Sequence, residues 1–163
     1  MSSNIINLLW ESFLETILMV GVSGGLGAAI GIPLGVFLFV TSPKGIMPKP
    51  YVNRIIGTIV NAVRSTPFII LLVAIIPFTR LIVGSSIGTV AAIVPLTIAA
   101  APLIARLVET SLREVDKGLI EAAQSMGATN TQIICKVLLP EAMPGILAGC
   151  LLYTSDAADE RSS

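Results

Sequence analysis

The chain has 163 residues, of which 54% are hydrophobic and only 12% are charged, and its mean hydropathy is +0.91. Soluble domains carry about 25% charged residues, so the composition indicates a membrane protein. The zero formal net charge gives no reason to expect a nucleic-acid partner, and the lack of histidine excludes imidazole bases and histidine-bound metals.

The first apolar stretch covers residues 16–40 and contains no charge. Its 25 residues would reach roughly 37 Å as a helix, enough to cross a hydrocarbon core of about 30 Å. Gly27, Gly31 and Gly35 recur at intervals of four, a pattern that lets another helix approach closely in lipid. The preceding residues place Trp10 at a membrane interface or form a frayed terminus; the sequence leaves both open.

Proline residues mark the boundaries of the next segments. Residues 41–50 read as a loop because of their Pro and Gly content. Residues 55–63 show helical apolar spacing, so they form an amphipathic surface helix or begin the second span. We place the second transmembrane helix at residues 65–79, with Pro67 in its first turn and Ser65 or Thr66 as its cap.

A third charge-free run follows Arg80. Gly84, Ser85 and Ser86 predict a turn, and a third span is expected at about residues 87–105, interrupted by Pro95 and Pro102. The prolines are typical either of a structural kink or of a bendable, pore-lining helix.

The basic residues predict the orientation of these spans. With the N-terminus outside, the inner segments hold eight basic residues and the outer ones hold only Arg80. This strong bias places the loop around Glu121 in the cytoplasm. The eight are Lys44, Lys49, Arg54, Arg64, Arg106, Arg113, Lys117 and Lys136.

A polar segment at residues 116–140 carries the most specific pattern. Asp116 is a good N-cap for a helix over residues 117–126, and Gly127 suits the left-handed residue that ends such a helix. Thr129 and Gln132 have capping-box spacing, so a second amphipathic helix should begin there and end near Pro140.

The first of these two helices has the composition of a docking element. Ala122, Ala123 and Ser125 are small enough to let it sit deep in a partner's groove, and Glu121 can offer a carboxylate to a basic group there. The alternative is an ordinary amphipathic helix pair that lies on the membrane or on its own domain.

The end of the chain changes character. Residues 141–149 begin a further apolar segment that does not complete, and residues 150–163 are polar and acidic. We expect residues 1–149 to be the N-terminal part of a transmembrane domain. Residues 150–163 resemble the translation of a sequencing-library adapter, so we interpret them as a non-native tail; a genuine disordered tail is the alternative.

Two kinds of chemistry are not expected. Cys135 and Cys150 lack the spacing of a metal site. No GxxxxGK[ST] phosphate loop occurs, so the chain should not hydrolyse ATP itself and needs no cofactor of its own.

Five stretches together resemble the methionine-import ABC permease family, whose cytoplasmic loop carries the Glu-Ala-Ala…Gly motif. The resemblance implies an all-α integral membrane protein with the ABC-importer permease fold. Three of the five family helices are present here, with the coupling loop and the start of a fourth. The stretches are residues 15–41, 60–88, 91–109, 118–129 and 136–145.

The same resemblance implies a role for the polar segment. Glu121, Ala122, Ala123 and Gly127 match the family motif that receives force from an ATPase. The implied partners are a dimer of ATP-binding subunits that holds ATP and magnesium, a second permease copy, an extracytoplasmic methionine-binding lipoprotein and membrane lipid. The implied location is the bacterial inner membrane.

Other functions stay open. The chain could be a permease for another amino acid or small solute, or a helical membrane scaffold. A secondary transporter is disfavoured, because the spans lack ionisable residues at their centres. No substrate-binding residue is identified, and the preference for L- or D-methionine is not encoded in any motif.

Overall fold

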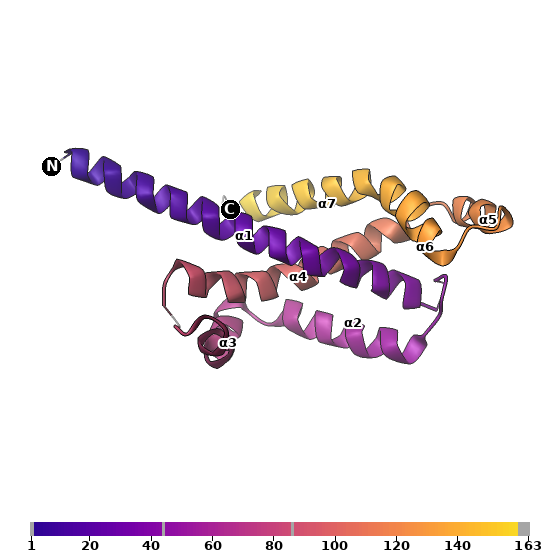
Figure 1. Ribbon diagram of the computed structural model, residues 1–163, viewed down its shortest axis with the longest axis horizontal. Coiled ribbons are helices and arrows are strands. Elements are labelled where there is room, and N and C mark those ends of the chain that lie inside the picture. Colours follow the sequence, from indigo (N-terminus) through magenta and orange to yellow (C-terminus); the bar gives the residue numbers. More distant parts are fainter. Residues whose placement is uncertain (1, 44, 86, 160–163) are drawn as a thin grey trace. The chain divides into compact units, whose positions relative to one another are not determined.

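The computed structural model describes residues 2–43, 45–85 and 87–159, and every regular element within these ranges is helical (Figure 1). The predicted all-α class is therefore confirmed. Lys44 and Ser86, which the sequence placed in loops, lie outside the described residues. The elements are α1 (Ser2–Thr41), α2 (Pro50–Ser65), α3 (Phe68–Val83), α4 (Thr89–Arg113), α5 (Lys117–Ser125), α6 (Asn130–Gln132), the π-helix η1 (Ile133–Leu138) and α7 (Leu139–Asp159).

The chain divides into two compact units. The first unit comprises Met1–Gly31 and Ile59–Leu103, and the second comprises Ile32–Thr58 and Ile104–Ser163. Each unit takes part of α1, so both are built on the longest helix.

Helix α1 begins at Ser2, so the frayed-terminus interpretation is wrong. The Trp10 and Phe13 rings, one turn apart, have centroids separated by 5.9 Å. Polar side chains inside the helix bond to its own backbone: the Ser23 hydroxyl donates to the Met19 carbonyl, and Thr16 donates to Ser12. A hydroxyl satisfied in this way can lie in an apolar environment without a partner from outside the helix.

The junction between α2 and α3 differs from the prediction. The Ser65 and Thr66 hydroxyls donate backwards to the Asn61 and Ala62 carbonyls of α2, so neither caps α3. Pro67 itself is the N-cap residue, and α3 begins at Phe68. A hydroxyl in the last turn of one helix has a carbonyl four residues back within reach, which competes with capping the next helix.

The second predicted span is also altered. Helix α3 has 16 residues, and it meets α2 at a bend of 112°. Only the two helices together satisfy the length and hydropathy of a membrane span. Helix α2 carries exposed apolar side chains as well as arginines, and whether it lies at the membrane surface or begins the second span stays a prediction.

The turn after α3 follows the sequence prediction at Gly84. This glycine has φ +83° and its N–H donates to the Arg80 carbonyl, which ends α3 in a left-handed conformation. Helix α4 then runs to Arg113 instead of ending near Ala105, and it passes through Pro95 and Pro102.

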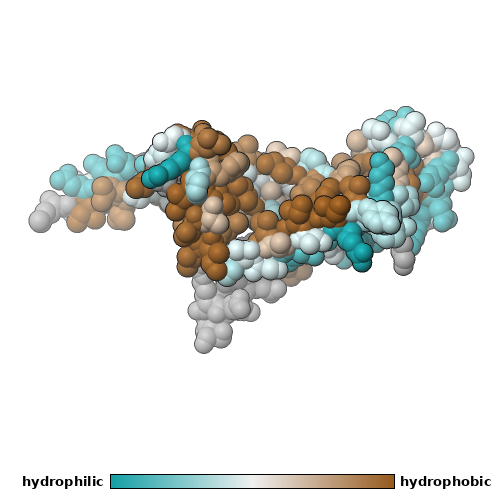
Figure 2. Space-filling view, turned by 90° about the horizontal axis from the view of Figure 1, so that it is seen from below, coloured by the Kyte–Doolittle hydropathy of each residue, from teal (hydrophilic) through white to brown (hydrophobic). Residues whose placement is uncertain are grey.

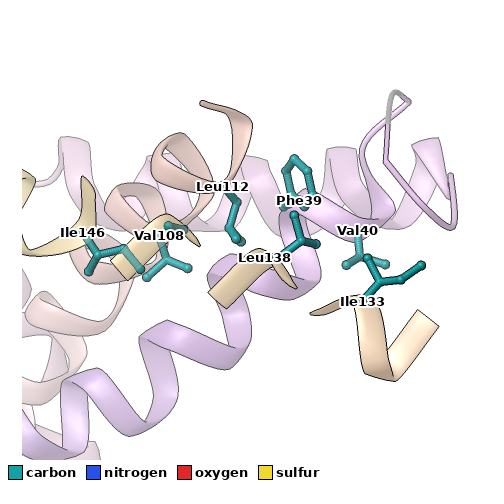
Figure 3. Packing of buried hydrophobic residues seen from close by; sticks show 8 residues of the cluster. Phe39, Val40, Val108, Leu112, Ile133, Leu138 and Ile146 are labelled. Carbon is teal, nitrogen blue, oxygen red and sulfur yellow. The ribbon is translucent and has the colours of Figure 1, made fainter. Parts of the chain in front are cut away.

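The core of the second unit is an apolar cluster between three segments of the chain. Phe39 and Val40 come from α1, Val108 and Leu112 from α4, and the remaining members from the last helical run (Figure 3). Those members are Ile133, Leu138, Ala142 and Ile146. The cluster fixes the end of α1 against the end of α4, directly before α5 begins.

The last helical run does not end at Pro140 as predicted. It continues from α6 through η1 into α7, which reaches Asp159. At the end of η1 the Leu139 N–H donates to the Ile134 carbonyl, five residues back. The last turn of η1 is therefore wider than an α turn, and the helical run continues past Pro140 into α7.

This continuity changes the predicted start of a fourth span. Asn130–Gly149 is long and apolar enough to cross a membrane, as are α1 and α4. The described residues therefore contain three such helices, or four if the bent pair of α2 and α3 is one span. The assignment of residues 150–163 as a non-native tail stays a prediction.

Candidate functional site

Helix α5 is a short helix with a defined stop at each end. The Asp116 carboxylate accepts a hydrogen bond from the Gly118 N–H at 2.9 Å, which confirms the predicted N-cap. At the other end Gly127 has φ +79°, as predicted. The Gly127 N–H donates to the Gln124 carbonyl at 3.0 Å, and the Ala128 N–H donates to the Ala123 carbonyl at 3.1 Å. These two bonds form a Schellman motif, which requires the left-handed residue that glycine adopts at low cost.

The predicted capping box after this turn is confirmed. The Gln132 N–H donates to the Thr129 hydroxyl at 3.3 Å, and the Thr129 N–H donates to Gln132 Oε1 at 3.1 Å. Two backbone donors at the start of α6 are thereby satisfied within the same four residues. Helix α5 and the turn after it are therefore held in place by local bonds at both ends.

One face of α5 packs inward. Ile120 and Ala123 lie against the apolar cluster, and so does Ala128 just after the turn. Ala123 therefore supports α5 from beneath, although its small side chain predicted contact with a partner. Its small side chain lets the α5 backbone lie close to the core.

A second face of α5, next to the packed one, is an exposed apolar stripe. Leu119, Ala122 and Met126 follow one another at intervals of three and four, and all three are exposed. Residues with this spacing share one side of a helix. Leu119 and Met126 were missed from the sequence, although the interval of seven between them was the available signal.

Glu121 is exposed on a different side of α5, about 100–160° around the helix axis from the stripe residues. Together with Lys117 and Gln124 it lines a small cavity of about 180 Å³, whose other walls include Phe39 and Ile46. No salt bridge to Glu121 occurs among the described residues. Its side chain is exposed, so a cation from outside the chain can reach the carboxylate.

A larger cavity lies under the start of α5. It has a volume of about 450 Å³, and Arg113 and Lys117 lie among otherwise mainly apolar walls. The remaining lining residues are Phe39, Ser42, Pro43, Leu112, Val115 and Ile120. The described side chains therefore leave space beneath α5. Hydrophilic residues gather around α5 and α6, at the right of Figure 2.

The glycines of the predicted packing strip are all buried. Gly27 and Gly31 lie in the first unit and Gly35 in the second. A Cβ added at Gly35 would lie 2.5 Å from the Ala105 carbonyl oxygen and 2.7 Å from Val108 Cβ. The backbones of α1 and α4 can approach as they do only because Gly35 has no side chain.

The described residues contain no group of three His, Cys, Asp or Glu side chains that could hold a metal ion. Cys135 is exposed and free. Helix α5 thus presents exposed apolar side chains, the exposed carboxylate of Glu121 and a backbone turn held by local hydrogen bonds.

The sequence matches a family model along most of its length. The match covers residues 31–158, and the family is described as the binding-protein-dependent transport system inner membrane component. The chain belongs to this family. The matched region includes all of α5, the turn at Gly127 and the apolar cluster beneath them, so the geometry above belongs to an inner membrane component of such a system.

Individual members of the family are also similar to this chain. The chain is 57% identical over 141 residues to a probable D-methionine transport system permease protein, MetI, of Vibrio cholerae. It is 56% identical over 147 residues to the D-methionine transport system permease protein MetI of Escherichia coli. These alignments cover 86% and 90% of the chain but only 63% and 68% of the relatives. The predicted resemblance is therefore confirmed over about two thirds of a relative's length.

Solved structures confirm the predicted permease fold. The chain matches two crystal forms of the MetNI methionine ABC transporter in inward-facing conformations, with 55% identity and TM-scores of 0.87 and 0.88. Each match covers 91% of this chain and 69% of the other. An amino acid ABC transporter solved with histidines shares the fold alone, at 21% identity and a TM-score of 0.56.

Proposed function

We propose that this inner membrane component is the permease subunit of an ATP-driven methionine importer. The observation that carries the proposal is the identity of 55–57% to methionine permeases, together with the structural match to MetNI. The exposed stripe on α5 supports the same function, because a permease needs a surface through which a separate subunit can move it.

In this proposal the ATP-binding subunit moves the permease by acting on α5. An ATP-binding subunit holds the stripe of Leu119, Ala122 and Met126 in a groove, and Glu121 meets a cation on the rim of that groove. Because α5 is capped at both ends and packed on the apolar cluster, it moves as a rigid body. Its movement displaces the ends of α1 and α4, and alternating access then follows from two packings of the bundle.

The proposed importer has further components besides this chain. ATP and magnesium bind to a pair of ATP-binding subunits, so this chain takes no cofactor. A second permease copy completes the pathway, and an extracytoplasmic methionine-binding lipoprotein delivers the substrate. The chain crosses the bacterial inner membrane with its N-terminus outside and α5 in the cytoplasm, an orientation supported by the distribution of Lys and Arg.

Docking is tested by co-purification. We would complete the chain to the length of its Escherichia coli relative, express it with the ATP-binding subunit, and replace Glu121 and Gly127 together by alanine. The first change removes the carboxylate, and the second strains the turn by about 1–2 kcal/mol, because alanine disfavours a left-handed φ. We expect the ATP-binding subunit to be lost from the purified complex.

The matched control replaces Glu11 and Gly25 by alanine. Glu11 is exposed, and a Cβ at Gly25 meets no other atom within 4 Å. Unchanged association in the Glu121/Gly127 variant would refute docking at α5.

Substrate specificity is tested by uptake of labelled methionine in cells that lack their own importer, with unlabelled L- and D-methionine as competitors. Competition by other amino acids alone would favour a different substrate.

A further inference from the structure

A buried carboxylate in α4 joins two arginines of the same helix. Glu109 is 3% exposed, and each of its oxygens meets a different guanidinium. Arg106 Nη1 lies 2.6 Å from Glu109 Oε2, and Arg113 Nη2 lies 2.6 Å from Glu109 Oε1. The three side chains form an ion network with a formal charge of +1.

The network reaches two other parts of the second unit. At one end Arg106 Nη2 donates to the Gly57 carbonyl of α2 at 3.1 Å, a contact between residues 49 positions apart. At the other end Arg113, whose side chain is 58% exposed, lines the cavity under α5 with Lys117 and Ile120. Glu109 thus stands between helix α2 and the space beneath α5.

Stability alone does not account for this network. Burying ions costs desolvation energy, and apolar side chains of similar size often serve a core as well or better. Arg106 Nε is buried and has no hydrogen-bond partner among the described residues, so the network is not fully satisfied. The directional bond from Arg106 to the Gly57 carbonyl is nevertheless suited to holding α2 in one arrangement at a time.

We propose that Glu109 is a positioning residue through which displacement of α5 is transmitted to α2. Movement of α5 changes the cavity beneath it and with it the position of Arg113. Glu109 follows Arg113 because it is bonded to it, and Arg106 carries the displacement to the Gly57 carbonyl. This inference rests on the proposed function, since it concerns how that same docking helix acts on the bundle.

The inference is tested by a variant that replaces the three charged side chains by apolar ones of similar size. In the completed permease, assembled with its ATP-binding subunit in liposomes, Arg106→Met, Glu109→Leu and Arg113→Met are combined. We measure methionine transported per ATP hydrolysed. The triple variant should assemble and hydrolyse ATP, while this ratio falls about tenfold, within the 5- to 150-fold range of allosteric coupling. Glu114→Gln, an exposed carboxylate just after α4, is the control and should leave the ratio unchanged.

An unchanged ratio in the triple variant would overturn the inference. If the triple variant does not assemble, the inference is tested with three other variants. They are Arg106→Met, Arg113→Met and the double variant that combines them. Non-additive effects on the ratio support a connected network, and additive effects refute it. If the unmodified permease did not bind the ATP-binding subunit, the proposed function would be overturned too. An unchanged ratio in the triple variant, by contrast, overturns only the inference about Glu109.

Discussion

At Gly35 the backbone of α1 lies directly against α4. The nearest atoms to an added Cβ would be a backbone carbonyl and the β-carbon of Val108, neither of which can rotate away. Small residues at such positions are a common way for membrane helices to pack, because the hydrophobic effect does not drive helices together in lipid. The sequence indicated this position through its spacing from Gly27 and Gly31.

Replacing Gly35 by alanine should destabilise the fold. Overpacking of this kind costs about 1–3 kcal/mol, and we expect a lower thermal unfolding temperature for the purified, completed permease in detergent. Gly25→Ala is the control, because a Cβ there meets no other atom within 4 Å and alanine is the better helix former. Equal unfolding temperatures for the two variants would contradict the close packing of α1 on α4.

Single residues were predictable where their interactions are local. Asp116, Gly127 and the Thr129–Gln132 pair form bonds within a few positions, so spacing and residue type were sufficient. Ser65 and Thr66 were misassigned because the α2 carbonyls compete for their hydroxyls. The inward packing of Ala123 was not predictable, since it depends on the apolar cluster that α1 and α4 contribute.

Among the elements, η1 sets how the last helical run meets the core. Ile133 and Leu138 are both fully buried although they are five residues apart. At about 100° per residue an α-helix would turn them about 140° from each other. The i to i+5 bonding of a π-helix brings residues five apart closer to one face. No pattern in the sequence predicts this turn, and Pro140 indicates a helix end instead.

Deleting Cys135 tests the role of η1. Without this exposed residue Ile133 and Leu138 stand four positions apart, which places them about 40° from each other in an α-helix. The run can then close into an α-helix with both side chains still in the cluster, so we expect the stability to change little. Removing either side chain from the cluster would instead cost about 1.5–3 kcal/mol. Thermal unfolding checks this against Cys135→Ser, which keeps the length. A loss of that size on deletion would mean that the extra residue of the π turn is required.

The extension of α4 past Ala105 has a related explanation. The predicted span ended where charges begin at Arg106, because a charged residue in lipid is costly. In the structure Glu109 pairs with both arginines, and the helix continues for two more turns to the base of α5. The spacing of three and four residues indicates these pairs, but the burial of Glu109 depends on tertiary packing.

At the scale of the whole molecule, the composition already indicated membrane helices. Only 17% of the apolar window in α1 is buried, so most of this helix requires lipid or another chain to cover it. The number and bounds of the spans were less predictable, because α2 and α3 bend at Pro67 and α6 to α7 continue past Pro140. The sidedness of the spans rests on the charge distribution.

The central claim is that the exposed face of α5 lies in the cytoplasm against an ATP-binding subunit. Two single-cysteine variants test it most directly, Met126→Cys and Ile87→Cys, with Cys135 and Cys150 replaced by serine. Their native side chains are 87% and 86% exposed, so the pair is matched in exposure while the charge distribution places the two residues on opposite sides. A thiol-directed crosslinker should join only Met126→Cys to the ATP-binding subunit. A membrane-impermeant maleimide added outside should label only Ile87→Cys. Labelling of Met126→Cys from outside, or crosslinking from Ile87→Cys alone, would contradict the account.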